Sequence, residues 1–425
     1  MTQASPAPDA AATGAPSAHR PGALAGVRVL DLSRILAGPW STQNLADMGA
    51  DVIKVERPGE GDDTRAWGPP FLTDPETGRI DSSYFISVNR GKRSITIDMA
   101  SAEGQAMVRE LAAQSDILVE NYKVGTLARY GLGYEDLRQV NPKLVYCSIT
   151  GFGQTGPYAE LPGYDFVFQG LGGLMSITGE PDEVPGGGPM KVGIAVADVL
   201  SGMYATVAIL GGLTHARATG VGQQLDIALL DCVIALTSYQ ALNWMMSGNT
   251  PQRIGNAHSN IVPYQVFACR EGHIIIAVAN DGQYQRYCQA IGLPELATDP
   301  RYRTVGDRNR NRGELIPVIA ERMRTRSRDE WIEILNAVNV PTGPIKTIPE
   351  AFDDPQVVHR QMRVQAQRAN GQVLPLLASP LRMSETPVAY DRAPPRLGEH
   401  TDEVLRTVLG YSAEKIAALR AAKAI

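Results

Sequence analysis

The chain has 425 residues, 44% of them hydrophobic, and a formal net charge of -5 at pH 7. A chain of this length can bury a large core and favours two domains over one. The negative charge argues against a general nucleic-acid-binding protein, although an anionic ligand needs only a local basic patch.

The cysteines and the hydropathy of the chain indicate the cellular compartment in which we expect the protein. The four cysteines, Cys147, Cys232, Cys269 and Cys288, are far apart and form no C-x-x-C pair. This spacing fits a reducing cytoplasm and predicts neither a disulfide framework nor a zinc site. No uninterrupted apolar segment approaches transmembrane length, so we expect a cytoplasmic protein without membrane contact.

The first 22 residues consist mainly of Ala, Pro and small polar residues. They lack the apolar core of a signal peptide, and with one Arg and one Asp they fit a mitochondrial transit peptide poorly. We expect a disordered tail over residues 1–22, whose role the sequence does not indicate.

Short apolar runs alternate with helical stretches from residue 27 onward. Strands are predicted at residues 27–32, 51–56, 94–99, 117–120 and 144–150. A helix beginning near Pro39 joins the first two strands, and Ser101 is placed to cap another helix whose apolar residues Met107, Val108, Leu111 and Ala112 share one face. This alternation predicts an α/β fold with a parallel sheet that is covered on both sides.

Ligands in such sheets bind at the carboxyl ends of the strands. The loops at that edge begin at Ser33, Arg57, Asn121 and Gly151. The first of them reads SRILAGP and lacks the dinucleotide-binding pattern G-x-G-x-x-G. The chain also lacks a Walker A motif, a G-x-S-x-G elbow and an H-E-x-x-H motif, so the usual support for an ATPase, a serine hydrolase or a zinc protease is missing.

The glycine-rich stretch 163–202 contains one carboxylate at a distinctive place. Asp198 directly precedes the apolar run 199–213, which we interpret as a buried helix that ends at Gly220. Asp198 therefore occupies the position of an N-cap, whose side chain accepts a backbone N–H. It could instead be a nucleophile that the helix N-terminus keeps ionised. The residues alone do not decide between these two interpretations.

The second half of the chain changes character after a predicted strand at 223–229 and a helix that runs through Trp244. Segments 264–269 and 273–279 flank Arg-Glu-Gly and predict a hairpin. Two amphipathic helices are predicted at 307–324 and 328–338, and a Pro-Thr-Gly-Pro sequence at 341–344 ends that section.

Basic residues gather in three places before residue 130: Lys54 with Arg57; Arg90 with Lys92 and Arg93; and Lys123 with Arg129. One interpretation is a solvated surface, because Lys and Arg are mostly exposed. The other is that some of these side chains bind phosphate groups, Arg bidentately.

Several motifs in order resemble the class III CoA-transferases, the family of formyl-CoA transferase and carnitine CoA-transferase. They are LDLSRILAGPWSTQNLADMGADVIKVERPGEGDDTR, NRGKRSITIDM, VENYKVGTLARYGL, GYD…Q, VADVLSGMYA and LGEHTDEVLRTVLGYS. The resemblance covers nearly everything after residue 22.

This resemblance implies a Rossmann-like large domain over 23–246, a smaller α+β domain over 247–345, and a linker that returns to the large domain over 346–425. It also implies a homodimer of two interlocked rings. Coenzyme A, carried as acyl-CoA, and a carboxylic acid would be the substrates, and no metal is expected.

The resemblance assigns roles to single residues. Asp198 matches the catalytic aspartate, which would attack the thioester of the acyl-CoA. The CoA contacts that it implies are Leu36, Ala37, Arg57, Ile97, Ala100, Asn121, Tyr122, Lys123, Arg129, Leu161 and Tyr164.

One segment departs from the formyl-CoA transferases, which carry a run of glycines over the active site. The comparable place here reads RIGNAHSNIVPYQVF, with Gly255 as its only glycine. It resembles the branch that uses succinyl-CoA and other dicarboxylic CoA donors. His258 in this segment either lines the acceptor pocket or is a structural histidine with its hydrogen bonds satisfied.

Two alternative functions remain open. A related racemase would need a histidine where this chain has Tyr164, and a phenol is a poor base near neutral pH. A CoA-binding protein without catalysis would use Asp198 only as a cap.

Overall fold

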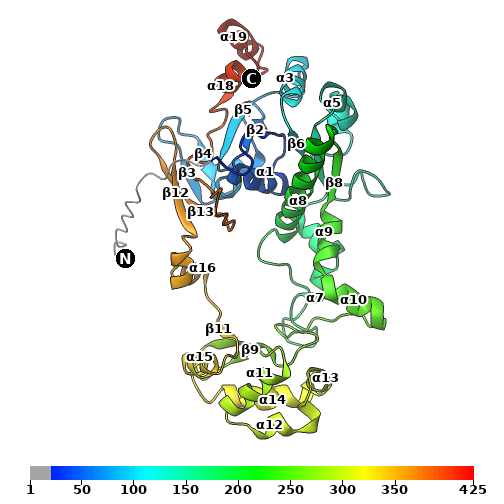
Figure 1. Ribbon diagram of the computed structural model, residues 1–425, viewed down its shortest axis with the longest axis vertical. Coiled ribbons are helices and arrows are strands. Elements are labelled where there is room, and N and C mark those ends of the chain that lie inside the picture. The colour runs from blue at the N-terminus through cyan, green and yellow to red at the C-terminus, as the bar shows by residue number, and fades with distance from the viewer. Residues whose placement is uncertain (1–20) are drawn as a thin grey trace. The chain divides into compact units, whose positions relative to one another are not determined.

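A computed structural model describes residues 21–425 of the chain (Figure 1). The tail predicted over residues 1–22 lies outside the described residues, apart from its last two. Contacts divide the chain into two compact units. Unit 1 contains the described residues up to Thr150, together with Gly202–Asp226 and Arg363–Ile425; unit 2 contains Gly151–Ser201 and Ile227–Met362.

A six-stranded sheet has the strand order β5-β2-β1-β6-β7-β8. Its strands are β1 (Arg28–Asp31), β2 (Asp51–Glu56), β5 (Lys92–Thr96), β6 (Ile117–Glu120), β7 (Val145–Thr150) and β8 (Gln224–Ala228). The pairs β1–β2, β1–β6, β2–β5 and β6–β7 are parallel, so the predicted α/β class is confirmed. The strands predicted at 51–56 and 117–120 are confirmed to the residue, whereas the one predicted at 94–99 begins two residues earlier and ends at Thr96.

Helices cover both faces of this sheet. Because side chains alternate along each strand, successive residues pack on opposite faces. Leu30, Ile53 and Leu118 pack on one face against helices α3 (Ala102–Ala113), α5 (Tyr134–Val140), α18 (Thr401–Thr407) and α19 (Ala413–Ala421). Ser101 caps α3 as predicted, since its hydroxyl accepts the Gly104 N–H at 3.0 Å.

The opposite face carries α1 (Ala37–Asp47) and the part of α8 (Val196–Thr219) that belongs to unit 1. Glycines let these elements approach closely. A Cβ at Gly202 would lie 2.5 Å from the Ala37 carbonyl oxygen, and one at Gly212 would lie 2.9 Å from Val145. The helix ends where predicted, at Gly220, whose φ is +77°.

The helix α8 is long and apolar enough to cross a membrane by length and composition, contrary to the expectation that no segment approaches that length. Core helices of soluble proteins pass the same test. In unit 1, Ala205, Ile209 and Leu213 of this helix are buried.

Smaller elements complete unit 1. They are the 3₁₀ helix η1 (Asp63–Ala66), hairpin strands β3 (Phe71–Thr73) and β4 (Ile80–Ser82), helices α2 (Ser83–Ser87) and α4 (Thr126–Arg129), and the antiparallel pair β12 (Arg363–Gln367) and β13 (Val373–Leu377).

Unit 2 contains a three-stranded antiparallel sheet of β9 (Tyr264–Ala268), β10 (His273–Ala277) and β11 (Thr342–Pro344). The predicted hairpin is confirmed, but Thr342–Pro344 adds a third strand where an end of structure was expected. Trp331, Tyr287 and Ile276 are fully buried in the core beside this sheet.

The helices of unit 2 include α6 (Asp165–Leu171), α7 (Leu174–Ile177), α9 (Leu229–Leu236), α10 (Ser238–Ser247), α11 (Asp281–Ala290), α12 (Glu295–Thr298), α13 (Val305–Arg310), α14 (Arg312–Met323), α15 (Arg328–Ala337), α16 (Ile348–Phe352) and α17 (Pro355–His359), with the 3₁₀ helix η2 (Pro300–Tyr302). The single helix predicted at 307–324 is divided at Asn311. The side-chain amide of Asn311 donates to the carbonyl oxygens of Arg301 and Asp307.

Candidate active site

Asp198 is the third residue of α8 and is half-buried. The prediction that it forms the N-cap is wrong, because the helix begins two residues earlier, at Val196. Asp165, at the start of α6, does the capping instead. Its Oδ1 accepts the backbone N–H of Ala197 at 2.7 Å and that of Asp198 at 3.3 Å.

Asp165 is held in turn by the buried side chain of Gln169, one helical turn further along α6. Gln169 Nε2 donates to Asp165 Oδ2 at 2.7 Å and to the Ile194 carbonyl at 3.3 Å. Its Oε1 accepts the Val192 N–H at 2.9 Å. One side chain thus fixes both the capping carboxylate and the segment that enters α8.

The Asp198 carboxylate is left available for chemistry. Within residues 21–425 it makes no hydrogen bond or ion pair of its own. Burial, together with the negative charge of Asp165, raises the pKa of Asp198 to about 7. A carboxyl group with this pKa holds a proton in a substantial fraction of molecules at neutral pH, and its ionised form is a competent nucleophile.

In unit 1, loops meet at the carboxyl ends of the neighbouring strands β1, β2 and β6, as the sequence predicts. Asn121 follows β6, and its side chain forms two hydrogen bonds with the backbone of Arg34, the second residue after Leu32 in the loop that follows β1. Asn121 Oδ1 accepts the Arg34 N–H at 2.8 Å, and its Nδ2 donates to the Arg34 carbonyl at 2.7 Å. The same loop is fixed from below by buried Glu120, which accepts the Tyr122 N–H at 2.8 Å.

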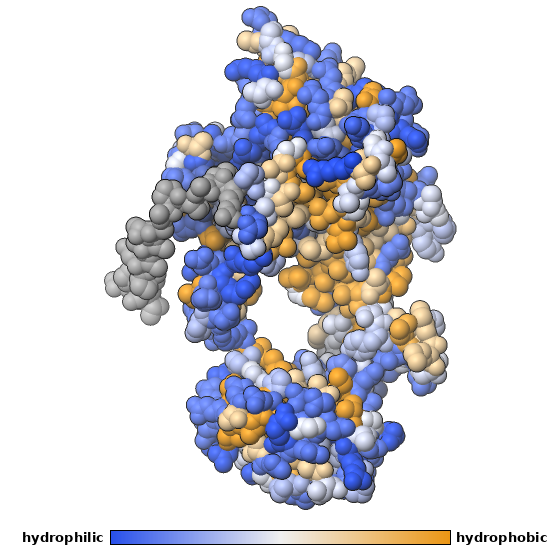
Figure 2. Space-filling view, viewed as in Figure 1, coloured by the Kyte–Doolittle hydropathy of each residue, from blue (hydrophilic) through white to orange (hydrophobic). Residues whose placement is uncertain are grey.

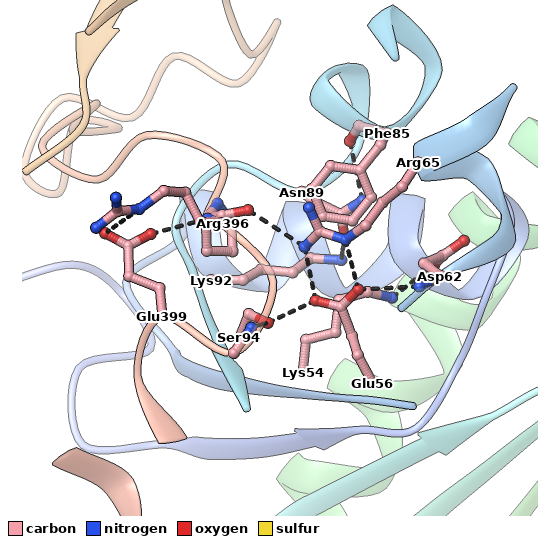
Figure 3. A network of polar contacts seen from close by, with 12 residues as sticks. Lys54, Glu56, Asp62, Arg65, Phe85, Asn89, Lys92, Ser94, Arg396 and Glu399 are labelled. Atoms are coloured by element: carbon pink, nitrogen blue, oxygen red, sulfur yellow. Dashed lines mark hydrogen bonds and ion pairs between the residues drawn. The ribbon is translucent and has the colours of Figure 1, made fainter. Parts of the chain in front are cut away.

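Beneath these loops lies a network of buried ion pairs (Figure 3). Lys54 Nζ pairs with Asp62 at 2.8 Å and donates to the Ser33 carbonyl at 2.9 Å. Lys92 Nζ pairs with Asp31 at 3.1 Å. Burial lowers the pKa of Lys92 to about 8, although the charge of Asp31 acts in the opposite direction.

The solvated-surface interpretation of the basic clusters is therefore wrong for Lys54, Arg90, Lys92 and Arg93, which are all buried. Arg90 pairs with Asp47, and Arg93 pairs with Asp51 at 2.6 Å. Lys123, Arg57 and Arg129 are exposed, so they are the members of the three clusters that solvent reaches.

Comparison with known proteins gives the family. The model of "CoA-transferase family III" matches residues 24–401. The chain belongs to CoA-transferase family III. It is a class III CoA-transferase, an enzyme that acts on an acyl-CoA.

Known relatives cover most of this CoA-transferase. A succinate–glutarate CoA-transferase from Agrobacterium fabrum is 49% identical over 90% of this chain and 94% of its own length. The human succinyl-CoA:glutarate CoA-transferase is 41% identical over 94% of this chain and 89% of its own length. A crystal structure of a CAIB/BAIF family protein from Brucella suis superposes with a TM-score of 0.80 at 46% identity, covering 92% of this chain and all of the other.

The CoA contacts implied by resemblance fall in both units of the CoA-transferase. In unit 1, Leu36 forms the N-cap of α1 and Ala37 begins that helix; both are buried, as is Ile97. Of the remaining positions in unit 1, Ala100, Lys123, Arg57 and Arg129 are exposed, and Asn121 and Tyr122 are half-buried.

Two of the implied contacts belong to unit 2, and both are exposed in the single chain. Leu161 is 52% exposed, and Tyr164, directly before α6, is 63% exposed. Gln169 and Arg34 were missed as individual residues, although both stand inside the quoted motifs. The spacing of Asp165 and Gln169, four residues apart on one helix face, is the signal that could have found the first.

His258 has satisfied hydrogen bonds on one side of its ring. Its Nδ1 accepts the N–H groups of Asn260 at 3.0 Å and Ile261 at 3.2 Å. The ring stacks on Tyr239 with centroids 5.3 Å apart. Burial and the charge of Arg312 lower the pKa of His258. These contacts favour the structural interpretation. Among residues 21–425, no group of three or more His, Cys, Asp or Glu side chains is arranged to hold a metal ion.

Proposed function

We propose that this CoA-transferase moves CoA from succinyl-CoA, or another dicarboxylic acyl-CoA, to a free dicarboxylic acid through covalent intermediates on Asp198. The observation that carries the proposal is that two neighbouring aspartates have different roles. Asp165 supplies the helix cap, so the carboxylate of Asp198 is free to react.

The substrate class rests on two supports. The relatives from Agrobacterium fabrum and humans are named for glutarate together with succinate or succinyl-CoA. The segment GNAHSNIVPYQ lacks the glycine run that resemblance associates with formyl-CoA transferases.

The reaction would proceed by four acyl exchanges. The ionised carboxylate of Asp198 attacks the thioester carbon and expels CoA as a thiolate, which leaves a mixed anhydride. The thiolate attacks the aspartyl carbonyl and expels the donor acid, which leaves an aspartyl-CoA thioester. The acceptor carboxylate then attacks this thioester and expels the thiolate again. Attack of the thiolate on the acceptor carbonyl yields the new acyl-CoA and regenerates Asp198. Each intermediate is an activated acyl group, so covalent catalysis divides one difficult exchange into easier steps.

CoA would be held largely by the loops of unit 1. Arg57 follows β2 and Arg129 ends α4, and both side chains are exposed cations suited to phosphate groups. Among residues 21–425, the Arg57 side chain pairs only with Glu60, at 3.0 Å. Both side chains are 71% exposed, so a phosphate could displace this weak pair.

The enzyme would work as an interlocked homodimer. Besides the family resemblance, exposed apolar side chains support an extensive interface. In unit 2, α10 exposes Leu242, Trp244, Met245 and Met246, and in unit 1, α8 exposes Val207. Figure 2 shows hydrophobic residues at the surface over both helices. Large exposed apolar patches of this kind mark interaction sites.

The experiment is a matrix of acyl-CoA donors and free acids, with the acyl-CoA products separated by chromatography. Succinyl-CoA with glutarate or another dicarboxylate should give the highest kcat/KM. Asp198→Ala should lower transfer by at least about 10³-fold, because the covalent route is lost. The matched control is Asp231→Ala, an exposed aspartate in the first turn of α9, which should retain activity. Faster transfer between formyl-CoA and oxalate than between any dicarboxylate pair would refute the substrate class.

A further inference from the structure

We propose that Arg34 is an additional CoA-binding residue, which contacts a phosphate group of the nucleotide, and that Asp63 holds it when CoA is absent. This inference rests on the proposed function and deepens it. Resemblance assigns CoA contacts to Leu36, Ala37, Asn121 and Tyr122 around it but assigns nothing to Arg34 itself.

The backbone of Arg34 is fixed at the edge where the loops converge. Its N–H and C=O groups both bond to the side chain of Asn121, at 2.8 and 2.7 Å. The loop after β1 is therefore locked to the loop after β6. Because two hydrogen bonds hold the backbone of Arg34 in place, less conformational entropy is lost when its side chain binds a ligand.

The next residue, Ile35, has a backbone conformation that the surrounding contacts must enforce. Ile35 has a φ of +71°, an unfavourable conformation for a β-branched residue. A conformation of this kind is strained and persists only where surrounding contacts enforce it. The Ile35 N–H lies 3.3 Å from Asp62 Oδ1, and the Asp62 carboxylate is anchored by Lys54. Strained backbone that the fold maintains in this way is commonly found at ligand sites.

The guanidinium of Arg34 is accessible and only weakly engaged. Its Nη1 lies 2.8 Å from Asp63 Oδ2, and the two side chains are 44% and 46% exposed. The guanidinium also lies over the ring of Tyr122, 5.4 Å from its centroid. Among residues 21–425, Nη1 is the only guanidinium nitrogen of Arg34 that forms a hydrogen bond, so further N–H donors are free for a ligand.

The chemistry favours exchange of Asp63 for a phosphate. An exposed ion pair stabilises the fold only weakly, because solvent screens the two charges. A phosphate offers more negative charge and can accept two parallel N–H bonds from one guanidinium. Lys54 and Lys92 are buried with their own acids and cannot serve this role.

Two substitutions with opposite expected effects test the inference. Titration calorimetry would measure the Kd for free CoA. Arg34→Ala should raise the Kd about tenfold or more, as expected for a lost hydrogen bond to a charged group. Asp63→Asn should lower the Kd about two- to fivefold, because Arg34 no longer has to leave a partner. Arg34→Lys should retain part of the affinity, since it keeps the positive charge but loses the planar guanidinium that donates two parallel N–H bonds.

A purely structural role for the pair gives a different result. If the Arg34–Asp63 pair only braces the loops, both substitutions should weaken CoA binding in the same direction. That outcome, or an unchanged Kd in Arg34→Ala, would overturn the inference. The control is Arg138→Ala, because Arg138 has a similar environment: it pairs with Glu135 and lies 5.5 Å from the ring centroid of Tyr134, away from these loops. Its Kd should match wild type.

Failure of the inference and failure of the proposed function remain distinguishable. If wild type does not bind CoA, the proposed function fails before Arg34 is considered. If wild type binds CoA and transfers it, but Arg34→Ala and Asp63→Asn do not differ in sign, only the role of Arg34 is refuted.

Discussion

In the proposed mechanism the carboxyl group of Asp198 has to be ionised to attack a thioester, and its surroundings oppose ionisation. Burial comes first among the causes and the charge of Asp165 second, and together they raise its pKa to about 7. A raised pKa suits a nucleophile, because a carboxylate that is too weakly basic would be a poor attacking group. A second carboxylate beside it therefore adjusts its reactivity as well as its position.

This arrangement predicts the pH dependence of the free enzyme. Below pH 7 Asp198 is increasingly protonated, so kcat/KM for the acyl-CoA should fall as the pH decreases, approaching tenfold per pH unit. Asp165→Asn removes one negative charge and should move this limb to lower pH, while lowering the maximal rate because the cap is altered. The measurement is a pH–rate profile of both proteins at constant ionic strength. A profile of wild type that stays flat from about pH 5.5 to 8 would contradict the assignment of the pKa to the nucleophile.

Among the elements, α1 depends on a buried cation for its place beside the sheet. Lys92, on β5, reaches Asp31 on β1 at 3.1 Å, the Pro39 carbonyl in α1 at 3.0 Å and Asn89 at 2.8 Å. A single ammonium group thus joins two strands to the helix whose first residues are implied in CoA binding.

Lys92→Met should lower the free energy of unfolding by about 3–5 kcal/mol, because it leaves the carboxylate of Asp31 buried without this partner. Urea unfolding would measure the change. Arg138→Met removes an exposed pair instead and should change stability by less than about 1 kcal/mol. An unfolding midpoint of Lys92→Met equal to that of wild type would show that the buried pair does not stabilise the unit.

The same elements show what the sequence could predict. The strands at 51–56 and 117–120 were found because β-branched and apolar runs are local signals. Lys92 was misjudged as a surface residue because its partner, Asp31, lies 61 residues earlier and is brought near only by the parallel sheet. Lys54 was misjudged because Asp62, eight residues later, reaches it only when the loop after β2 folds back. The β11 strand was missed because Gly and Pro carry no strand signal.

Asp198 was singled out as a candidate nucleophile, but the sequence placed it wrongly at the N-cap position of α8. A capping residue is expected next to the helix it caps. Asp165 caps α8 from 33 residues earlier in the chain, across a glycine-rich loop that gives no sign of the contact. The CoA contacts came from resemblance and not from residue chemistry, and they stay predictions.

For the whole molecule, the proposed interlocked dimer predicts a property that an ordinary dimer lacks. Two linked rings cannot separate without unfolding, so tagged and untagged proteins that are mixed after purification should not exchange subunits. Light scattering should give twice the chain mass, and affinity capture of the tagged protein should not retain the untagged one. A monomer mass, or mixed dimers that form under native conditions, would contradict the interlocked assembly.

The central claim is that the acyl group and CoA pass through the side chain of Asp198. The most direct measurement is to incubate wild type with succinyl-CoA, quench with hydroxylamine, and search its peptides by mass spectrometry for an aspartyl hydroxamate. We predict the hydroxamate at Asp198, dependent on succinyl-CoA and absent from Asp198→Ala. Active enzyme that turns over rapidly but yields no modification at Asp198, or yields it at another carboxylate, would contradict the proposed mechanism.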